Sequence, residues 1–421
     1  MTSPAPVPLL TAIDAFVAAD GLYLDCAAHG PPLCGVSAAA MTALQDDNTN
    51  WFGTHWRERV ERVRTLAAQL FDGDADAVAL VPSAAYGLSL AARNLPLQRG
   101  EAVLVLDGQF PSNLLPWQQR CVEVGARMVV ARRDARHDWT AAVLRALDDA
   151  PGIVTLALPH VHWQDGTLLD LTTIANRAHE RDARLVLDLS QSLGALPVDM
   201  DEWRPDFVVA VGYKWLLGPY GLAYVWAAPH WRDAGVPLEH GWMACDTDAL
   251  WQAAGNAETK PMAGARRFDA DGVCDLTRLA MAEAALTQIL AWGVSNIAMA
   301  LRVRTETFAS ALRAHGLGDW LPANPVAHFC ALQPPAEYVE TLAQALSAEG
   351  VVLTLHKGRL RIAPHLHVSP TQLETLATRI AELFNRHSGL SARRFPSPAL
   401  AGEGKSGGID PAKPIVSVPD Q

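Results

Sequence analysis

Short apolar runs alternate with longer amphipathic stretches through the first half of the chain. The runs are four to seven residues long and occupy 78–82, 102–107, 128–131, 153–158, 184–190, 207–211 and 222–226. Helix-like segments fill the intervals between the first six runs, and this alternation predicts a largely parallel sheet with helices on both faces. Only ten residues separate the last two runs, too few for a helical crossover, so we expect one of these strands to be antiparallel.

The pattern changes after about residue 276. Two long helical stretches, 276–293 and 294–316, come first, and a final helix follows three strand-like pieces at 326–332, 351–355 and 359–363. This order is typical of a smaller α+β domain. The sequence therefore predicts an N-terminal segment (1–22), a large domain (23–275), a small C-terminal domain (276–388) and a Ser/Pro/Gly-rich tail (389–421) that is expected to be disordered.

Charge and composition narrow the range of partners. The formal net charge is −11 and there is no basic run, which disfavours a nucleic-acid partner. No apolar stretch has the length of a membrane span, and the first residues do not resemble a secretory signal. The six cysteines are scattered without a CxxC pair, so we expect reduced thiols in the cytoplasm.

Lys214 and Asp188 carry the strongest chemical signal. Lys214 lies in VVAVGYKWLLGPYGLAYVW between two apolar runs, where lost hydration favours the neutral amine that can attack an aldehyde. Asp188 ends the preceding run in RLVLDLSQSLGA. A carboxylate for the ring nitrogen and a lysine for the Schiff base are the two protein groups that pyridoxal phosphate (PLP) requires. Separately, Asp188 could cap a helix and Lys214 could be a surface lysine; together they favour a cofactor site.

These segments, in order over roughly 20–385, resemble the class V aminotransferase superfamily of fold-type I PLP enzymes. That group includes kynureninases, cysteine desulfurases, isopenicillin-epimerase-like enzymes and transaminases. The resemblance implies an α/β fold with a mostly parallel seven-stranded sheet flanked by helices, plus a smaller C-terminal α+β domain. It also implies a pyridoxal 5′-phosphate cofactor, an α-amino-acid substrate, and a homodimer with shared active sites.

The resemblance also assigns roles to individual residues. Lys214 would form the internal aldimine and act as the catalytic base, while Asp188 would pair with the pyridine nitrogen. Gln191 would lie near the phenolic oxygen and Tyr213 at the phosphate. The other implied cofactor-binding residues are Ser83, Ala84 and Ala85 at the phosphate, Phe110 stacked on the ring beside Ser112 and Asn113, Trp163 close to the cofactor, and Trp242 reaching in from the neighbouring subunit.

The substrate would be held by Arg361, which takes the place of the arginine that binds the α-carboxylate, with Ala28 and His29 at the mouth. Bidentate geometry explains why lysine would be a poor substitute for this arginine. A surface charge on a strand is the alternative for Arg361, and a helix N-cap is the alternative for Ser112. Two positions depart from the family: Ala85 replaces a hydroxyl residue and Asn113 replaces an acidic one.

Two other site types are disfavoured. His160 and His162 would share one face of a strand, but no third metal ligand is evident nearby. GYK lacks the GxxxxGK[ST] spacing of a nucleotide-binding loop.

The reaction type is less well defined by the sequence. Desulfurases place a nucleophilic cysteine just before the arginine strand, but VVLTLHKGRLRIAP has none, and Cys330 lies in an apolar run typical of core. Local segments such as HVHW and FPSN favour kynureninase, whereas CAAHG and GWMAC depart from it. We expect a transaminase, with a kynureninase-like Cβ-cleaving enzyme as the alternative. A non-catalytic PLP-fold binding protein and a cofactor-free Schiff-base lyase are the alternatives of other classes.

Overall fold

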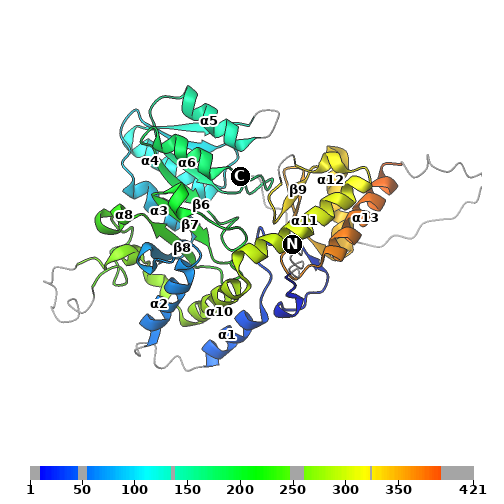
Figure 1. Ribbon diagram of the computed structural model, residues 1–421, viewed down its shortest axis with the longest axis horizontal. Coiled ribbons are helices and arrows are strands. Elements are labelled where there is room, and N and C mark those ends of the chain that lie inside the picture. Colours follow the sequence, from blue (N-terminus) through cyan, green and yellow to red (C-terminus); the bar gives the residue numbers. More distant parts are fainter. Residues whose placement is uncertain (1–9, 46–54, 134–137, 247–259, 323–324, 390–421) are drawn as a thin grey trace, which may run out of the picture.

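The computed structural model describes residues 10–45, 55–133, 138–246, 260–322 and 325–389. A large domain built on a central sheet lies beside a smaller lobe that contains β9, α12 and α13, and the long helix α11 reaches from one to the other (Figure 1). The tail that was predicted to be disordered lies, apart from residue 389, outside the described residues.

The large sheet has seven strands, as predicted. Its order is β2 (Val78–Val81), β8 (Ala223–Ala227), β7 (Phe207–Val211), β6 (Arg184–Asp188), β5 (Ile153–Pro159), β3 (Ala102–Leu106) and β4 (Arg127–Ala131). The adjacent strands β7, β6, β5, β3 and β4 are parallel to one another, and β8 is antiparallel to both β7 and β2. The prediction that one strand of the last pair is antiparallel is therefore confirmed, and that strand is β8.

Helices cover both faces of this sheet because its strands are apolar on both sides. In β6, Leu185 and Leu187 pack into one core and Val186 into the other, as the two-residue period of a strand requires. The connecting helices are α3 (Ala84–Asn94), α4 (Leu115–Val124), α5 (Trp139–Asp149), α6 (Leu171–His179) and α7 (Met200–Trp203), and α8 (Pro229–Ala234) follows β8. Helices α1 (Cys34–Gln45) and α2 (His55–Ala68) pack against α10 (Leu276–Trp292). Short 3-10 turns are η1 (Ile13–Ala15), η3 (Ala75–Ala77), η4 (Pro111–Asn113), η5 (Gly264–Phe268), η6 (Asp271–Cys274) and η7 (Gly318–Trp320).

The smaller lobe has its own apolar core and a three-stranded antiparallel sheet. Its elements are α11 (Val294–Ala314), β9 (Cys330–Leu332), α12 (Ala336–Ala348), β11 (Thr354–His356), β12 (Arg359–Ile362) and α13 (Pro370–His387). The strand predicted at 326–332 is shorter, and the one predicted at 351–355 is two strands. The first of these two strands, β10 (Val351–Val352), does not join the three-stranded sheet but pairs with β1 (Leu22–Tyr23). No single described helix is long and apolar enough to cross a membrane; α10 and α11 pass that test only as a pair bent by 76°.

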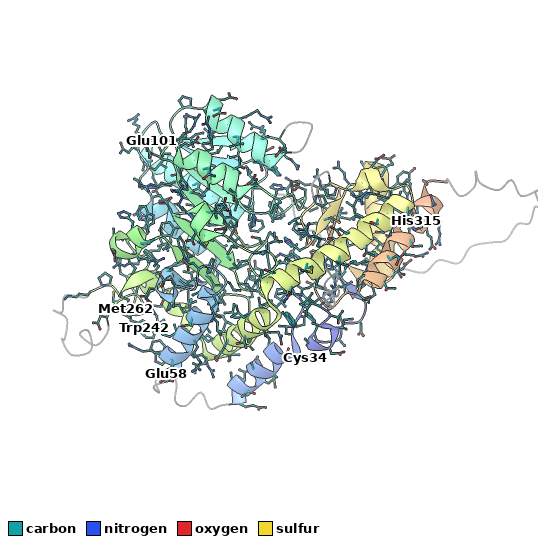
Figure 2. All side chains as sticks on the ribbon, viewed as in Figure 1. Cys34, Glu58, Glu101, Trp242, Met262 and His315 are labelled. Carbon is teal, nitrogen blue, oxygen red and sulfur yellow. The ribbon has the colours of Figure 1, made fainter. Side chains whose placement is uncertain are left out.

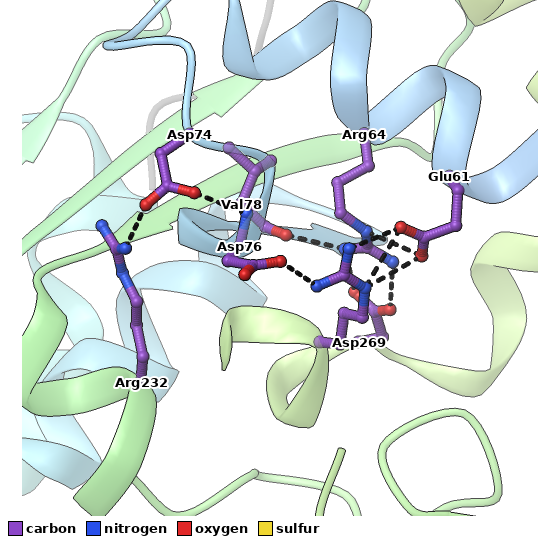
Figure 3. Close-up of polar contacts among 8 residues, drawn as sticks. Glu61, Arg64, Asp74, Asp76, Val78, Arg232 and Asp269 are labelled. Atoms are coloured by element: carbon purple, nitrogen blue, oxygen red, sulfur yellow. Dashed lines mark hydrogen bonds and ion pairs between the residues drawn. The ribbon is translucent and has the colours of Figure 1, made fainter. Parts of the chain in front are cut away.

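A buried ion pair fixes the edge of the large sheet next to the site (Figure 3). Arg64 on α2 and Asp269 after η5 are each almost completely buried and make two hydrogen bonds, of 3.0 and 2.6 Å. Arg64 also donates to the Val78 carbonyl (2.7 Å), and Asp269 accepts from the Leu80 amide (2.8 Å). The network therefore joins α2 and the segment after η5 to β2, the strand that leads directly into the start of α3.

Candidate active site

A cavity of about 230 Å³ lies where several strands of the large sheet end. The carboxyl edge of a parallel sheet is the usual place for a ligand in α/β folds. Eleven of the twelve residues predicted to bind the cofactor line this cavity: Ser83, Ala84, Ala85, Phe110, Ser112, Asn113, Trp163, Asp188, Gln191, Tyr213 and Lys214. The fold thus gathers side chains that follow β2, β3, β5, β6 and β7 around one space.

Lys214 is held in an apolar and aromatic environment. Its side-chain nitrogen lies 5.4 Å from the ring centre of Phe110 and 5.9 Å from that of Tyr213. Burial lowers the pKa of the Lys214 amine to about 8, although the nearby Asp188 charge acts in the opposite direction. The backbone here is tightly packed, since a Cβ at Gly30 would clash with the Lys214 carbonyl oxygen. Because its pKa is lowered, a larger fraction of the Lys214 amine is neutral near physiological pH than in a free lysine.

Asp188, at the end of β6, is 7% exposed, and burial raises the pKa of its carboxyl group. Within the described part of the chain its hydrogen-bond donor is the Ser190 amide, at 2.9 Å. A buried carboxylate is stabilised by further donors or by a positive charge. A protonated pyridine nitrogen would supply both, so Asp188 fits the role that the sequence predicts for it.

Gln191 is fixed on three sides. Its amide nitrogen donates to the Ala27 carbonyl (2.8 Å), and its amide oxygen accepts from the Trp215 indole (2.9 Å). The buried His328 ring donates to the Gln191 backbone carbonyl at 2.6 Å. One N–H of the Gln191 amide remains for a ligand, because a primary amide carries two.

The opposite end of the cavity suits a phosphate. Ser83 caps α3 by accepting from the Tyr86 amide (3.1 Å), so the first turn of α3 presents free backbone N–H groups at Ala84 and Ala85. Burial raises the pKa of Tyr213 to about 12, which keeps its hydroxyl group protonated as a donor. This donor set fits the phosphate of PLP without a side-chain hydroxyl at Ala85.

The aromatic side of the cavity consists of Phe110 and Trp163. Their rings meet edge to face, with centres 5.2 Å apart and planes at 85°. The Trp163 indole donates to the Gly108 carbonyl (2.9 Å), and its ring lies 4.6 Å from that of His356 on β11. Asn113, predicted to depart from the family pattern, accepts from the Trp117 indole at 3.2 Å and so also holds the start of α4 in place.

Arg361 does not line the cavity directly. It is almost completely buried on β12 and reaches the cavity wall through a 3.3 Å hydrogen bond from Nη1 to the Trp163 carbonyl. Its Nη2 forms an ion pair with Asp25 at 3.1 Å, and Asp25 also accepts from the Thr354 hydroxyl at 2.6 Å. Its Nε is buried without a hydrogen-bond partner. The alternative that Arg361 is a surface charge is therefore wrong.

Asp25, the partner of Arg361, is not among the residues that the sequence predicts for the site. The only local signal was an acidic residue inside the apolar stretch YLDCAAHG, next to Ala28 and His29. Those two predicted residues are exposed and lie outside the cavity lining, with the His29 ring 5.7 Å from the Tyr213 ring. Tyr220, whose ring centre is 4.5 Å from that of Tyr213, was also not singled out and lines the cavity.

Trp242 lies away from the cavity of its own chain. It packs edge to face against Trp56, with ring centres 5.1 Å apart, and lines a separate depression together with Met262. Figure 2 shows Trp242 and Met262 in the same part of the molecule. Its predicted contact with the cofactor of a neighbouring subunit stays a prediction.

The histidines considered as metal ligands and the cysteine considered for desulfurase chemistry lie outside the cavity lining. His162 pairs with Asp165 at 3.0 Å, and among the described residues no cluster of three or more His, Cys, Asp or Glu side chains is arranged to hold a metal ion. All six cysteines are free. Cys330 is buried in β9, where burial raises the pKa of its thiol to about 12.

Comparisons with known proteins agree on one family. The family model described as aminotransferase class V matches residues 22–310. An uncharacterized aminotransferase, YcbU of Bacillus subtilis (strain 168), is 29% identical over 228 residues, which cover 50% of this chain and 57% of the relative. A cysteine desulfurase of Klebsiella pneumoniae (strain 342) is 28% identical over 260 residues, or 61% and 62% of the two chains. The chain thus spans roughly three-fifths of the length of these relatives.

Solved structures show the same fold at low identity. An apo cysteine desulfurase from Thermococcus onnurineus NA1 has a TM-score of 0.75 at 18% identity, covering 86% of this chain and 94% of that one. A C-DES variant with glycine covalently linked to its PLP cofactor has a TM-score of 0.77 at 19% identity, covering 86% and 97%.

Proposed function

Because the chain belongs to the class V aminotransferase family, whose members are PLP-dependent enzymes, we propose that it is a transaminase that acts on an α-amino acid through Lys214. Its cofactor is pyridoxal 5′-phosphate. One observation carries the proposal: Lys214, Asp188 and the N-terminus of α3 line the same cavity. An amine, a carboxylate and a set of phosphate donors around one space are what this cofactor needs.

Bound PLP supplies an aldehyde that condenses with amines and a ring that accepts electrons from the substrate Cα. The chain's own residues do the rest. Asp188 holds a proton on the ring nitrogen, and the α3 N-terminus with the Tyr213 hydroxyl binds the phosphate. Lys214 Nζ, with its lowered pKa, takes the proton from the substrate Cα and can return one.

Arg361 binds the substrate α-carboxylate in this proposal. The guanidinium has five N–H donors, of which one is used by Asp25 and one by the Trp163 carbonyl. The donors that remain include the buried Nε–H. Asp25 and Thr354 hold the group in a fixed orientation, which reduces the entropy lost when a carboxylate binds.

The available thiols support a transaminase over a desulfurase. Transfer of sulfur from a cysteine substrate to an enzyme thiol needs a thiolate at the substrate. Cys26, whose Sγ lies 3.8 Å from the Lys214 carbonyl oxygen, is fully buried with a raised pKa, and Cys330 lies in β9. Neither lines the cavity. The relatives named above are an aminotransferase and a desulfurase, so they lend no support to the kynureninase-like alternative.

The resemblance also leads us to propose a cytoplasmic homodimer in which Trp242 of the partner subunit lies at the cofactor. Sedimentation of the holoprotein should give twice the chain mass of 45.3 kDa.

The test of function uses purified holoprotein. It should absorb near about 420 nm, and borohydride should fix the cofactor to Lys214, as peptide mass spectrometry can show. A panel of amino acids with an α-keto acid acceptor should yield new keto acids. Lys214→Ala should abolish turnover, whereas the control Lys260→Ala should not. Absence of both the absorbance and the Lys214 adduct would contradict the proposal, and alanine with sulfide or an arene product would indicate Cβ cleavage instead.

A further inference from the structure

Trp163 lines the cavity and contacts both Phe110 and Arg361. Its carbonyl accepts from Arg361 (3.3 Å), its ring meets the Phe110 ring edge to face, and its other side contacts the His356 ring. Trp163 is therefore the lining residue that directly joins the Arg361 side of the site to the aromatic side, where a substrate side chain could pack.

The loop that carries Trp163 is held by several polar contacts. Asp165 accepts from the Thr167 amide (2.9 Å), pairs with the His162 ring (3.0 Å) and forms an ion pair with the half-buried Arg133 (2.7 Å). A Cβ at Gly166, which has a φ of +69°, would lie 2.9 Å from the Phe329 ring, so this turn is closely packed. The indole hydrogen bond to Gly108 fixes the ring itself. Trp163 thus offers a preorganised aromatic surface.

The surroundings of this surface carry little free charge. Among the described residues that line the cavity, only Lys214 and Asp188 are ionisable at ordinary pH, and both are assigned to the cofactor. Arg361 and Asp25, which lie behind the cavity lining, are paired with each other. At the mouth, Tyr220 is 70% exposed and stands 4.5 Å from Tyr213. A charged substrate side chain would lose water here without gaining a partner, whereas an aromatic one would gain ring contacts.

We propose that the substrate is an α-amino acid with an uncharged aromatic or large apolar side chain, and that Trp163 determines this specificity. The inference rests on the proposed function, because it takes the α-carboxylate to Arg361 and the amine to Lys214. The side chain packs against the Trp163 ring and extends toward Tyr220.

The test compares kcat/KM for phenylalanine, leucine, alanine, aspartate and lysine with the holoenzyme. Phenylalanine should exceed alanine by about 10-fold and aspartate or lysine by about 100-fold, because each lost apolar contact or unpaired charge lowers kcat/KM. Trp163→Ala should reduce kcat/KM for phenylalanine by roughly 10- to 100-fold, mainly through KM, and change that for alanine less than about threefold. Trp163→Phe should keep most of the kcat/KM for phenylalanine that Trp163→Ala loses. Tyr338→Phe, in the small lobe, serves as the control.

A separate readout distinguishes substrate selection from a role in holding the cofactor. Trp163→Ala should bind PLP within about threefold of the unchanged protein in equilibrium dialysis. A variant that weakens PLP binding and all amino acids alike would overturn the inference. Aspartate or lysine reacting as well as phenylalanine would also overturn it, while leaving the transaminase proposal intact. If no amino acid reacts at all, the proposed function itself fails and this inference fails with it.

Discussion

The Lys214 amine should capture PLP at a pH where ordinary lysines are almost fully charged. Its pKa of about 8, compared with 10.5 for a free side chain, means that the site on balance disfavours the ammonium form by about 3 kcal/mol, with burial as the main cause. At pH 7 about one-tenth of the amine is neutral, against about one in 3,000 for a free lysine, which is a ratio of roughly 300. Since only the neutral amine attacks an aldehyde, the capture rate should rise tenfold per pH unit up to about 8 and then level off.

Stopped-flow absorbance after mixing the apoprotein with PLP measures this profile, and borohydride trapping at Lys214 identifies the amine. Asp188 stabilises the ammonium form, so Asp188→Asn should move the midpoint below 8. The sign follows because removing a nearby negative charge makes the positive form less favourable. A rate that keeps rising tenfold per unit to pH 10 would refute the lowered pKa of Lys214. A midpoint that moves upward in Asp188→Asn would refute the stabilisation of the ammonium form by Asp188.

Three other substitutions test separate parts of the structure. Arg361→Lys should raise KM for amino acids by about 10- to 100-fold in steady-state assays, with the visible spectrum of the holoenzyme unchanged, because an ammonium cannot form the bidentate contact. Arg64→Leu should lower the free energy of unfolding, measured in urea, by about 3–5 kcal/mol, because it leaves the Asp269 carboxylate buried and unpaired. The control Arg379→Leu removes a surface ion pair with Glu349 and should have little effect. Ala85→Thr should tighten PLP binding severalfold in equilibrium dialysis by adding a hydroxyl donor at the α3 N-terminus, and unchanged or weaker binding would mean that the phosphate lies elsewhere.

The sequence could predict the large sheet and the centre of the site for the same reason. Strands buried on both faces are continuous apolar runs, so their ends are visible, and Asp188 and Lys214 follow two such ends. The division of 351–355 could not be predicted, because the partner of Val351 is Leu22, more than three hundred residues earlier. No local pattern records that pairing. The same holds for Asp25, whose ion pair with Arg361 joins residues 336 positions apart.

Asp25 changes how the proposed substrate recognition by Arg361 has to be understood. A guanidinium this deeply buried would be strongly destabilising if it had no counter-charge before substrate binds, and Asp25 supplies one. In the proposed binding mode, the incoming carboxylate therefore meets a neutral pair instead of a bare cation. Its affinity must come chiefly from directed hydrogen bonds to the donors that Asp25 and the Trp163 carbonyl leave free, including Nε–H. Recognition then depends on the orientation of the guanidinium that Asp25 and Thr354 impose. Because Arg361 also donates to the Trp163 carbonyl, this orientation is set together with the position of the Trp163 ring in the cavity wall.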